Sequence, residues 1–184
     1  MRSGFFVFAS LLLLAGCTSN VDLTQYGDVQ MQNDSIHSVA LSFPGEGDPD
    51  KMLMCIAKNV SNDAVVMTNS GGFVGQATGR YHSATANYAV GGGSVLQYVS
   101  ADGSHIVANG EKGFARGIAQ ASLRFMLDIK QKGGARTYEF TKIEQAGTYN
   151  GYGYGPVGIM PGQGGGQVLD TLKALAGQLE LCMN

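Results

Sequence analysis

The chain has 184 residues, of which 44% are hydrophobic and 14% charged, with 28 glycines, no tryptophan and a formal net charge of −2. This length suits one domain with a hydrophobic core. The slightly acidic balance, without a basic patch, argues against binding to nucleic acid and against electrostatic docking on anionic lipid. The many glycines favour turns and loops over a bundle of helices.

The first 16 residues have the three parts of a secretory signal. Arg2 gives a positive start, residues 5–15 are almost entirely apolar, and Ala15 and Gly16 supply small side chains for a cleavage site. The apolar run is too short to cross a bilayer as a helix, which takes about 20 residues. We therefore expect residues 1–16 to be a signal peptide that is removed on export.

The sequence Leu14-Ala15-Gly16-Cys17 resembles the lipobox of bacterial lipoproteins. This resemblance implies cleavage before Cys17, whose sulfur receives a diacylglycerol and whose amine is acylated. Several acyl chains anchor a protein stably, because each buried methylene adds about 0.8 kcal/mol. Thr18 and Ser19 follow without the Asp that retains many such proteins in the inner membrane, which implies the outer membrane, facing the periplasm. The alternative is an ordinary signal peptide with a cysteine nearby by chance.

Once Cys17 carries lipid, the two remaining cysteines are Cys55 and Cys182. In an oxidising compartment such a pair is expected to form a disulfide. The bridge would link the first core segment of the domain to its last. The alternative is two buried free thiols, and the chain has no CxxC spacing typical of a thiol–disulfide enzyme.

The exported chain is predicted to begin with a lipidated N-terminus and flexible tether, residues 17–36, which is polar and has little periodicity. Residues 37–184 then form a single periplasmic domain. Ser38–Phe43 alternates weakly and predicts a first strand, and Pro44–Asp50 breaks it.

The middle of the chain predicts strands and a hairpin. Met52–Ala57 is a compact apolar run typical of a buried strand, which Ala64–Met67 would pair with. Asn69–Gly93 is rich in small residues and predicts a long loop or a poorly packed hairpin. Ser94–Ser100 and His105–Ala108 flank an Asp-Gly pair, which indicates a β-hairpin.

The last third predicts two long strands and a helix. Ser122–Ile129 and Arg136–Ile143 alternate in hydrophobicity on either side of a Lys-Gly-Gly turn. Val168–Leu181 instead has apolar residues at helical spacing, and continuing that stripe brings Cys182 onto the same face. The predicted fold class is therefore α+β, an antiparallel β-sheet packed against a C-terminal amphipathic helix.

A glycine-rich segment, residues 147–166, separates the last predicted strand from this helix. Gly153, Gly155 and Gly158 satisfy GxGxxG, but prolines follow in a long loop instead of the strand and helix that a dinucleotide site needs. We therefore expect no nucleotide and no other cofactor. Glycines ahead of the helix could also leave N–H groups free for an anion, a weaker alternative.

Three tyrosines mark this segment as a possible contact with a partner. The rings of Tyr149, Tyr152 and Tyr154 would supply rigid, amphipathic contact area at low entropic cost. The alternative is a mobile connector between the strand and the helix.

The chain shows no marked catalytic or metal site. His37, His82 and His105 are far apart and lack ligand spacing, and a metal site would need them to converge with carboxylates such as Asp102 or Asp128. No GxSxG motif is present, and no Ser, His and Asp set is marked by local context.

We therefore expect a non-enzymatic lipoprotein that reaches the membrane through its N-terminal lipid and binds an envelope protein. The role would be assembly, or exclusion of phage or plasmid entry. Two alternatives remain. One is a hydrolase acting on peptidoglycan or lipid, which would need a histidine beside a buried carboxylate and a serine. The other is a structural subunit of an envelope complex, which an exposed strand edge would favour.

Overall fold

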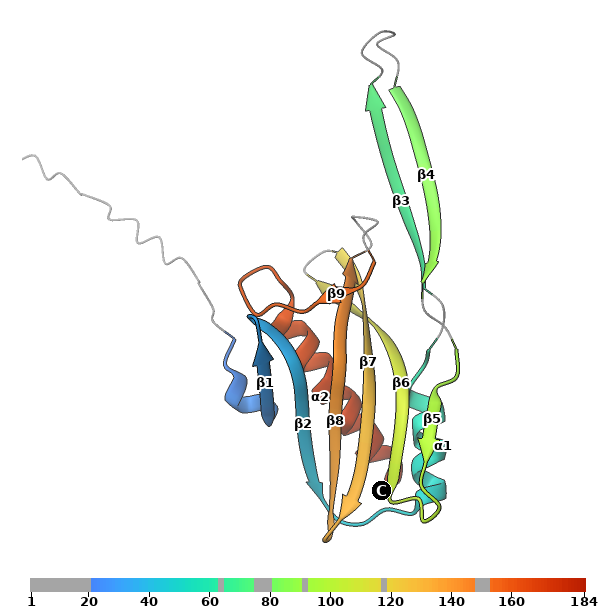
Figure 1. Cartoon of the computed structure of the whole chain (residues 1–184), viewed down its shortest axis with the longest axis vertical. Coiled ribbons are helices and arrows are strands. Elements are labelled where there is room, and N and C mark those ends of the chain that lie inside the picture. The colour runs from blue at the N-terminus through green and yellow to red at the C-terminus, as the bar shows by residue number, and fades with distance from the viewer. Residues whose placement is uncertain (1–20, 63–64, 75–80, 91–92, 117–118, 148–152) are drawn as a thin grey trace, which may run out of the picture.

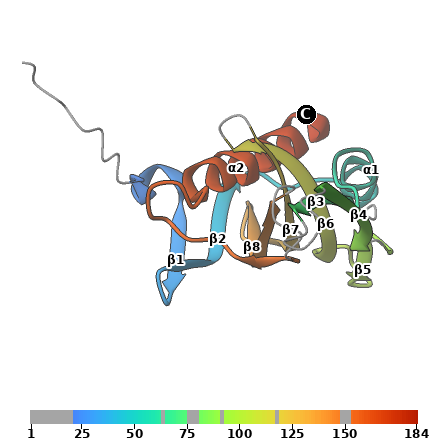
Figure 2. The same cartoon turned by 90° about the horizontal axis from the view of Figure 1, so that it is seen from above.

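The fold is an antiparallel sheet with two helices on one of its faces (Figures 1 and 2). The computed structural model describes residues 21–62, 65–74, 81–90, 93–116, 119–147 and 153–184. Strands run in the order β1-β2-β8-β7-β6-β5, with β9 paired to β8 and a separate β3-β4 pair. This architecture confirms the α+β class. In chain order, the elements are η1 (Leu23–Tyr26), β1 (Asp28–Gln32), β2 (Ser35–Pro44), α1 (Pro49–Asn59), β3 (Val65–Val74), β4 (Tyr81–Val90), β5 (Leu96–Val99), β6 (His105–Arg116), β7 (Ala119–Lys132), β8 (Ala135–Gly147), β9 (Gly155–Pro156) and α2 (Gly165–Met183).

The two long strands predicted in the last third are confirmed as β7 and β8. They are joined by Gly133 and Gly134, whose φ angles of 64° and 76° provide the left-handed pair that a type I′ hairpin turn needs. Alternate residues of β7 point into the core, as their sequence pattern predicts, and these are Leu123, Phe125, Leu127 and Ile129. The Asp-Gly hairpin is likewise confirmed, as β5 paired to β6.

The C-terminal helix α2 covers the apolar face of the sheet (Figure 2). Every residue of its predicted apolar stripe is buried: Val168, Leu169, Leu172, Leu175, Ala176 and Leu179. Burial of these side chains supplies most of the contact between helix and sheet, at roughly 25 cal/mol per Å² of apolar surface.

The strand predicted at Met52–Ala57 is wrong, because these residues belong to helix α1. The helix begins where the Asp48 carboxylate accepts a hydrogen bond from the Asp50 N–H at 2.9 Å, with Pro49 in the first turn. Met52 is buried, as are Cys55 and Ile56, at helical spacing. The expected pairing with Ala64–Met67 is therefore wrong too, since Val65 begins β3.

The predicted tether is also wrong for residues 21–36, which belong to the domain. Tyr26 is buried and its hydroxyl donates to Asp170 on α2 at 2.8 Å. Strand β1 then pairs with β2, and the alternate residues Val29 and Met31 pack against the core. A short edge strand with one apolar side explains the weak periodicity. Residues 17–20 lie outside the described residues.

Of the two structures predicted for Asn69–Gly93, a long loop or a hairpin, the structure shows the hairpin. Strands β3 and β4 pair over ten positions without a register shift, from Val65↔Val90 to Val74↔Tyr81. The hairpin extends beyond the end of the main sheet as a separate two-stranded ribbon (Figure 1). The side chains of this hairpin lie outside the described residues.

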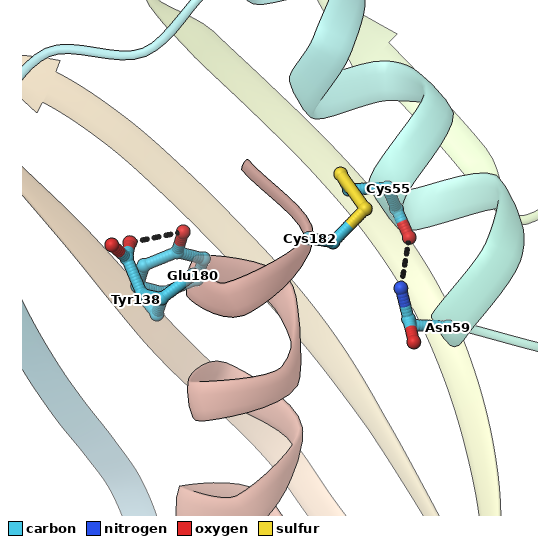
Figure 3. The surroundings of a disulfide bond; sticks show 5 residues. All are labelled: Cys55, Asn59, Tyr138, Glu180 and Cys182. Carbon is cyan, nitrogen blue, oxygen red and sulfur yellow. Dashed lines mark hydrogen bonds between the residues drawn. A yellow bond between two sulfur atoms is a disulfide. The ribbon is translucent and has the colours of Figure 1, made fainter. Parts of the chain in front are cut away.

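A disulfide joins the two helices, as the cysteine count predicts (Figure 3). Cys55 on α1 and Cys182 at the end of α2 have Cα atoms 5.8 Å apart and a sequence separation of 127. Within α1, the Asn59 amide donates to the Cys55 carbonyl at 2.8 Å. The bond therefore encloses most of the domain in one covalent loop.

A buried ion pair fixes α2 on the sheet near this bond. The Glu180 carboxylate accepts from Arg136 Nε at 2.9 Å, from Arg136 Nη2 at 2.5 Å and from the Tyr138 hydroxyl at 2.6 Å. Burial acts to raise the pKa of Glu180, but the hydrogen bonds from Arg136 and Tyr138 outweigh it and hold that pKa below its usual value. The carboxyl is therefore more acidic in the folded state than in the unfolded chain.

The disulfide predicts a large loss of stability when both cysteines are removed. We expect Cys55→Ala/Cys182→Ala to lower the free energy of unfolding by about 5 kcal/mol, because the unfolded chain then gains the freedom of an open loop. Urea unfolding of the oxidised wild type and the double variant measures this. Dithiothreitol should shift the wild-type curve and leave the variant's unchanged. Coincident curves for the two proteins would contradict a native bridge.

The ion pair predicts a distinct pH dependence. Since the folded pKa of Glu180 is lowered from 4.5, the pair stabilises the fold above that pH and its contribution is lost as the pH falls through the folded pKa. We expect Glu180→Gln to cost about 3 kcal/mol at pH 7, because Arg136 stays buried and unpaired. The variant's stability should also fall less steeply below pH 4.5 than that of the wild type.

The matched control for the ion pair is Glu139→Gln. Glu139 pairs with Lys130 at 3.5 Å with its side chain 39% exposed, and such surface pairs contribute about 0–1 kcal/mol. If the two variants lost the same free energy of unfolding at pH 7, the buried pair would stabilise the fold no more than a surface pair does.

Candidate functional site

The candidate site lies on the face of the sheet away from the helices. A row of charged residues crosses three neighbouring strands there, because Glu111 on β6 is in register with Arg124 on β7, and Arg124 with Glu144 on β8. Arg124 donates to the Glu144 carboxylate from Nε at 2.6 Å and from Nη2 at 2.5 Å. These two hydrogen bonds fix the plane of the Arg124 guanidinium between β6, which carries Glu111, and β8, which carries Glu144.

Tyr154 covers this row from the segment before β9. Its hydroxyl donates to the Glu111 carboxylate, and Arg124 Cζ lies 4.3 Å from the centre of its ring, a cation–π contact. Burial, followed by the hydrogen bond to Glu111, raises the pKa of Tyr154 above its usual range. Glu111 is consequently only 5% exposed although it lies on the outer face.

The structure places the three predicted contact tyrosines differently. Tyr149 and Tyr152 lie outside the described residues. Tyr154 is half-buried against its own sheet, so most of its ring is engaged within the domain. Contact between these tyrosines and a partner stays a prediction.

A bulge in β8 shapes the surface beside this row. The register between β7 and β8 shifts between Arg124 and Met126, and Lys142 takes a φ of 49°. A left-handed conformation is unusual for lysine, and bulges of this kind redirect side chains. Past the bulge, Glu144 pairs with Pro156 of β9 instead of with β2.

Two hollows flank the bulge. One, of about 300 Å³, includes Asn109, Glu111 and Arg124 in its lining. The other, of about 590 Å³, opens where β2 and β8 separate and includes His37 and Thr141. Lys142 and Glu144 line both hollows, and the first hollow adds Arg124 and Glu111 to them, so a ligand in either hollow would meet groups of both charges.

The predicted histidines do not converge. His37 is exposed, and the side chain of His82 lies outside the described residues. His105 Nε2 lies 2.9 Å from Asp128 Oδ1, in a cross-strand ion network that includes Lys130, whose Nζ is 3.4 Å from Asp128. No group of three or more metal-ligating side chains gathers within the described part of the chain.

Serine hydroxyls near His105 serve the turn between β5 and β6. The Ser100 hydroxyl accepts from the His105 backbone N–H at 2.9 Å and donates to Asp102 at 2.6 Å. This hydrogen bond and those from Ser104 lower the pKa of Asp102 to about 2. Among the described residues, the imidazole of His105 therefore has a carboxylate beside it, that of Asp128, but no serine hydroxyl hydrogen-bonded to its ring.

The GxGxxG glycines do not form a phosphate loop. Gly155 is part of β9, which pairs with the end of β8, and Gly158 makes a bridge with Ser35 at the start of β2. Helix α2 begins only at Gly165. The strand, tight turn and helix that a dinucleotide site requires are therefore not arranged around these glycines.

Comparisons with known proteins add little to this site. No family model matches the chain, and no curated protein matches it. Among solved structures it is similar to a DUF4468 family protein from Bacteroides ovatus, with 13% identity and a TM-score of 0.49 over 89% of this chain and 96% of that one. It is also similar to a TBP-like protein from Parabacteroides distasonis, with 10% identity and a TM-score of 0.46 over 84% of this chain and 96% of that one.

The contact between Tyr154 and Glu111 predicts a measurable loss on removing one hydroxyl. We expect Tyr154→Phe to lower the free energy of unfolding by about 1–3 kcal/mol, because a buried carboxylate loses a hydrogen-bond donor. Urea unfolding measures the change. Tyr98→Phe is the control, since Tyr98 is 51% exposed and should tolerate the change. Unchanged stability of Tyr154→Phe would mean that the segment before β9 is not held on the sheet.

Proposed function

We propose that the protein is a lipoprotein anchored in the outer membrane, facing the periplasm, which binds another envelope component without catalysis. The observation that carries this proposal is the Leu14-Ala15-Gly16-Cys17 sequence after an apolar run. The Cys55–Cys182 disulfide supports it, since structural disulfides persist in exported proteins and are rare in the reducing cytoplasm. Within the described residues, no helix is long and apolar enough to cross a membrane.

The proposed anchor would hold the domain close to the bilayer. Val21 already belongs to the fold, beside Gly166 at the start of α2, and only Thr18, Ser19 and Asn20 separate it from Cys17. Each residue spans at most about 3.6 Å, so the link is short. Confinement near one membrane raises the effective concentration of partners in that membrane, which supports a binding role.

The open face of the sheet is the proposed binding surface. Its two hollows combine Lys142, Glu144 and amide side chains, and this mixture suits recognition of a polar protein or glycan surface. Arg124 is held between a carboxylate and an aromatic ring, so it presents a fixed geometry to a ligand. The proposed partner is an envelope protein, bound for assembly or for exclusion of phage or plasmid entry.

A hydrolase is the second candidate, because His105 lies beside Asp128. A histidine and carboxylate pair is one part of a nucleophilic site. The serine hydroxyl that would complete it is engaged elsewhere, since Ser100 bonds to Asp102. The contacts around His105 therefore favour binding over hydrolysis.

The lipid anchor predicts where the protein is found and what it captures. We expect Cys17→Ala to leave the membrane fraction and to lose metabolic labelling with a fatty acid. In-cell crosslinking followed by mass spectrometry should recover one dominant envelope protein with the wild type and much less with the variant, because the two would no longer share a membrane.

The control is Cys55→Ala/Cys182→Ala, which keeps Cys17 and should still be labelled and membrane-bound. Membrane retention of Cys17→Ala would contradict the anchor. A labelled, membrane-bound wild type that captures no reproducible protein would contradict the binding role and direct attention to His105 and a small substrate.

A further inference from the structure

The β3-β4 hairpin has little support from the other elements that the structure describes. Among the described elements, the two strands pack extensively only on each other, and they project beyond the main sheet (Figure 1). A lone two-stranded hairpin is marginally stable in water, and independent stability takes a third strand or a packed face. A hairpin of ten paired positions is therefore expected to be stabilised by something outside the domain.

The edges of this hairpin are open to strand addition. Exposed strand edges are usually protected by charged residues, proline or bulges. The sequences of β3 and β4, VVMTNSGGFV and YHSATANYAV, contain no Asp, Glu, Lys, Arg or Pro, whereas 14% of the whole chain is charged. Their pairing also has no register shift. Both outer edges thus offer unprotected backbone donors and acceptors.

These edges fit each other better than they fit either edge of the main sheet, where β1 and β5 lie. Strands β3 and β4 each have ten residues, so the outer edge of β4 in one copy matches the outer edge of β3 in another along its full length. The edge strands of the main sheet are shorter, since β1 has five residues and β5 has four. Two uncharged edges can also meet in identical copies without placing like charges opposite each other.

We propose that the protein self-associates through this hairpin, with β4 of one copy pairing antiparallel to β3 of a second copy. Such a head-to-tail contact uses two different edges, so a third copy can add in the same way, and the series closes into a ring if the rotation allows. All copies then point in the same direction. The proposal does not depend on the lipid anchor, although copies held in one membrane would share that orientation.

Deleting the hairpin tests the proposal on the full chain. Val65 and Val90 are a register pair, so their Cα atoms lie about 5 Å apart and a Gly-Ser-Gly linker can replace residues 65–90. The readouts are in-cell crosslinking and sedimentation of the detergent-solubilised protein. We expect a ladder of multimers from the wild type and loss of that ladder in the deletion, with the main unfolding transition retained. A monomeric wild type, or a ladder that survives deletion, would overturn the proposal.

A matched pair of charge variants keeps the test valid if the deletion fails to fold. Ser70→Lys places a charge in the middle of β3, and Gln97→Lys places one in β5, whose residues are exposed. We expect Ser70→Lys to lose the ladder and Gln97→Lys to retain it, because only the first puts a charge on the pairing edge. The reverse result would identify β5 as the contact and overturn the proposal.

Discussion

The structure depends on covering one face of a single antiparallel sheet. The inward side chains of β7 and β8 are large and apolar, and α2 is the element that removes them from water. Two contacts fix its position: the Arg136–Glu180 pair attaches the helix to β8, and the disulfide attaches it to α1 (Figure 3). The position of α1 and the enclosure of the core both depend on this cover.

The opposite face of the sheet carries polar side chains, because α2 covers only the apolar face. Because side chains alternate along a strand, each apolar residue in β7 leaves a polar neighbour on the outer face, and Arg124 is one of these. The bulge at Lys142 extends this division to the end of β8, since it turns Ile143 inward and Glu144 outward. The pairing of Arg124 with Glu144 depends on that single extra residue, and Lys142 and Glu144 beside it line both hollows.

The elements predicted well from the sequence have local signals. Glycines in the turns specified the β5-β6 and β7-β8 hairpins, and the 3.6-residue period specified α2. Helix α1 was missed because Met52–Ala57 is too short for its period to distinguish helix from strand. The informative signal was the Asp48-Pro49 pair before it, which matches a helix start.

The candidate site could not be predicted in the same way, because it depends on register and on a distant segment. Continuing the pairing of Lys132 with Ala135 without a bulge would place Arg124 opposite Ile143. Only the bulge brings Glu144 there, and only the path of the chain after β8 brings Tyr154 over Arg124. Neither the bulge nor the path of the chain after β8 produces a periodic pattern in the sequence.

The long covalent loop closed by the disulfide also bears on how the protein responds to proteases. Every element from β3 to β9 lies between Cys55 and Cys182. A single cut anywhere in that span, including the projecting hairpin where a protease has the easiest access, leaves both fragments joined through sulfur. The nicked molecule keeps its N-terminal piece bound to α2 and migrates as two bands only after reduction. A cut in the hairpin thus need not separate the two parts of the domain.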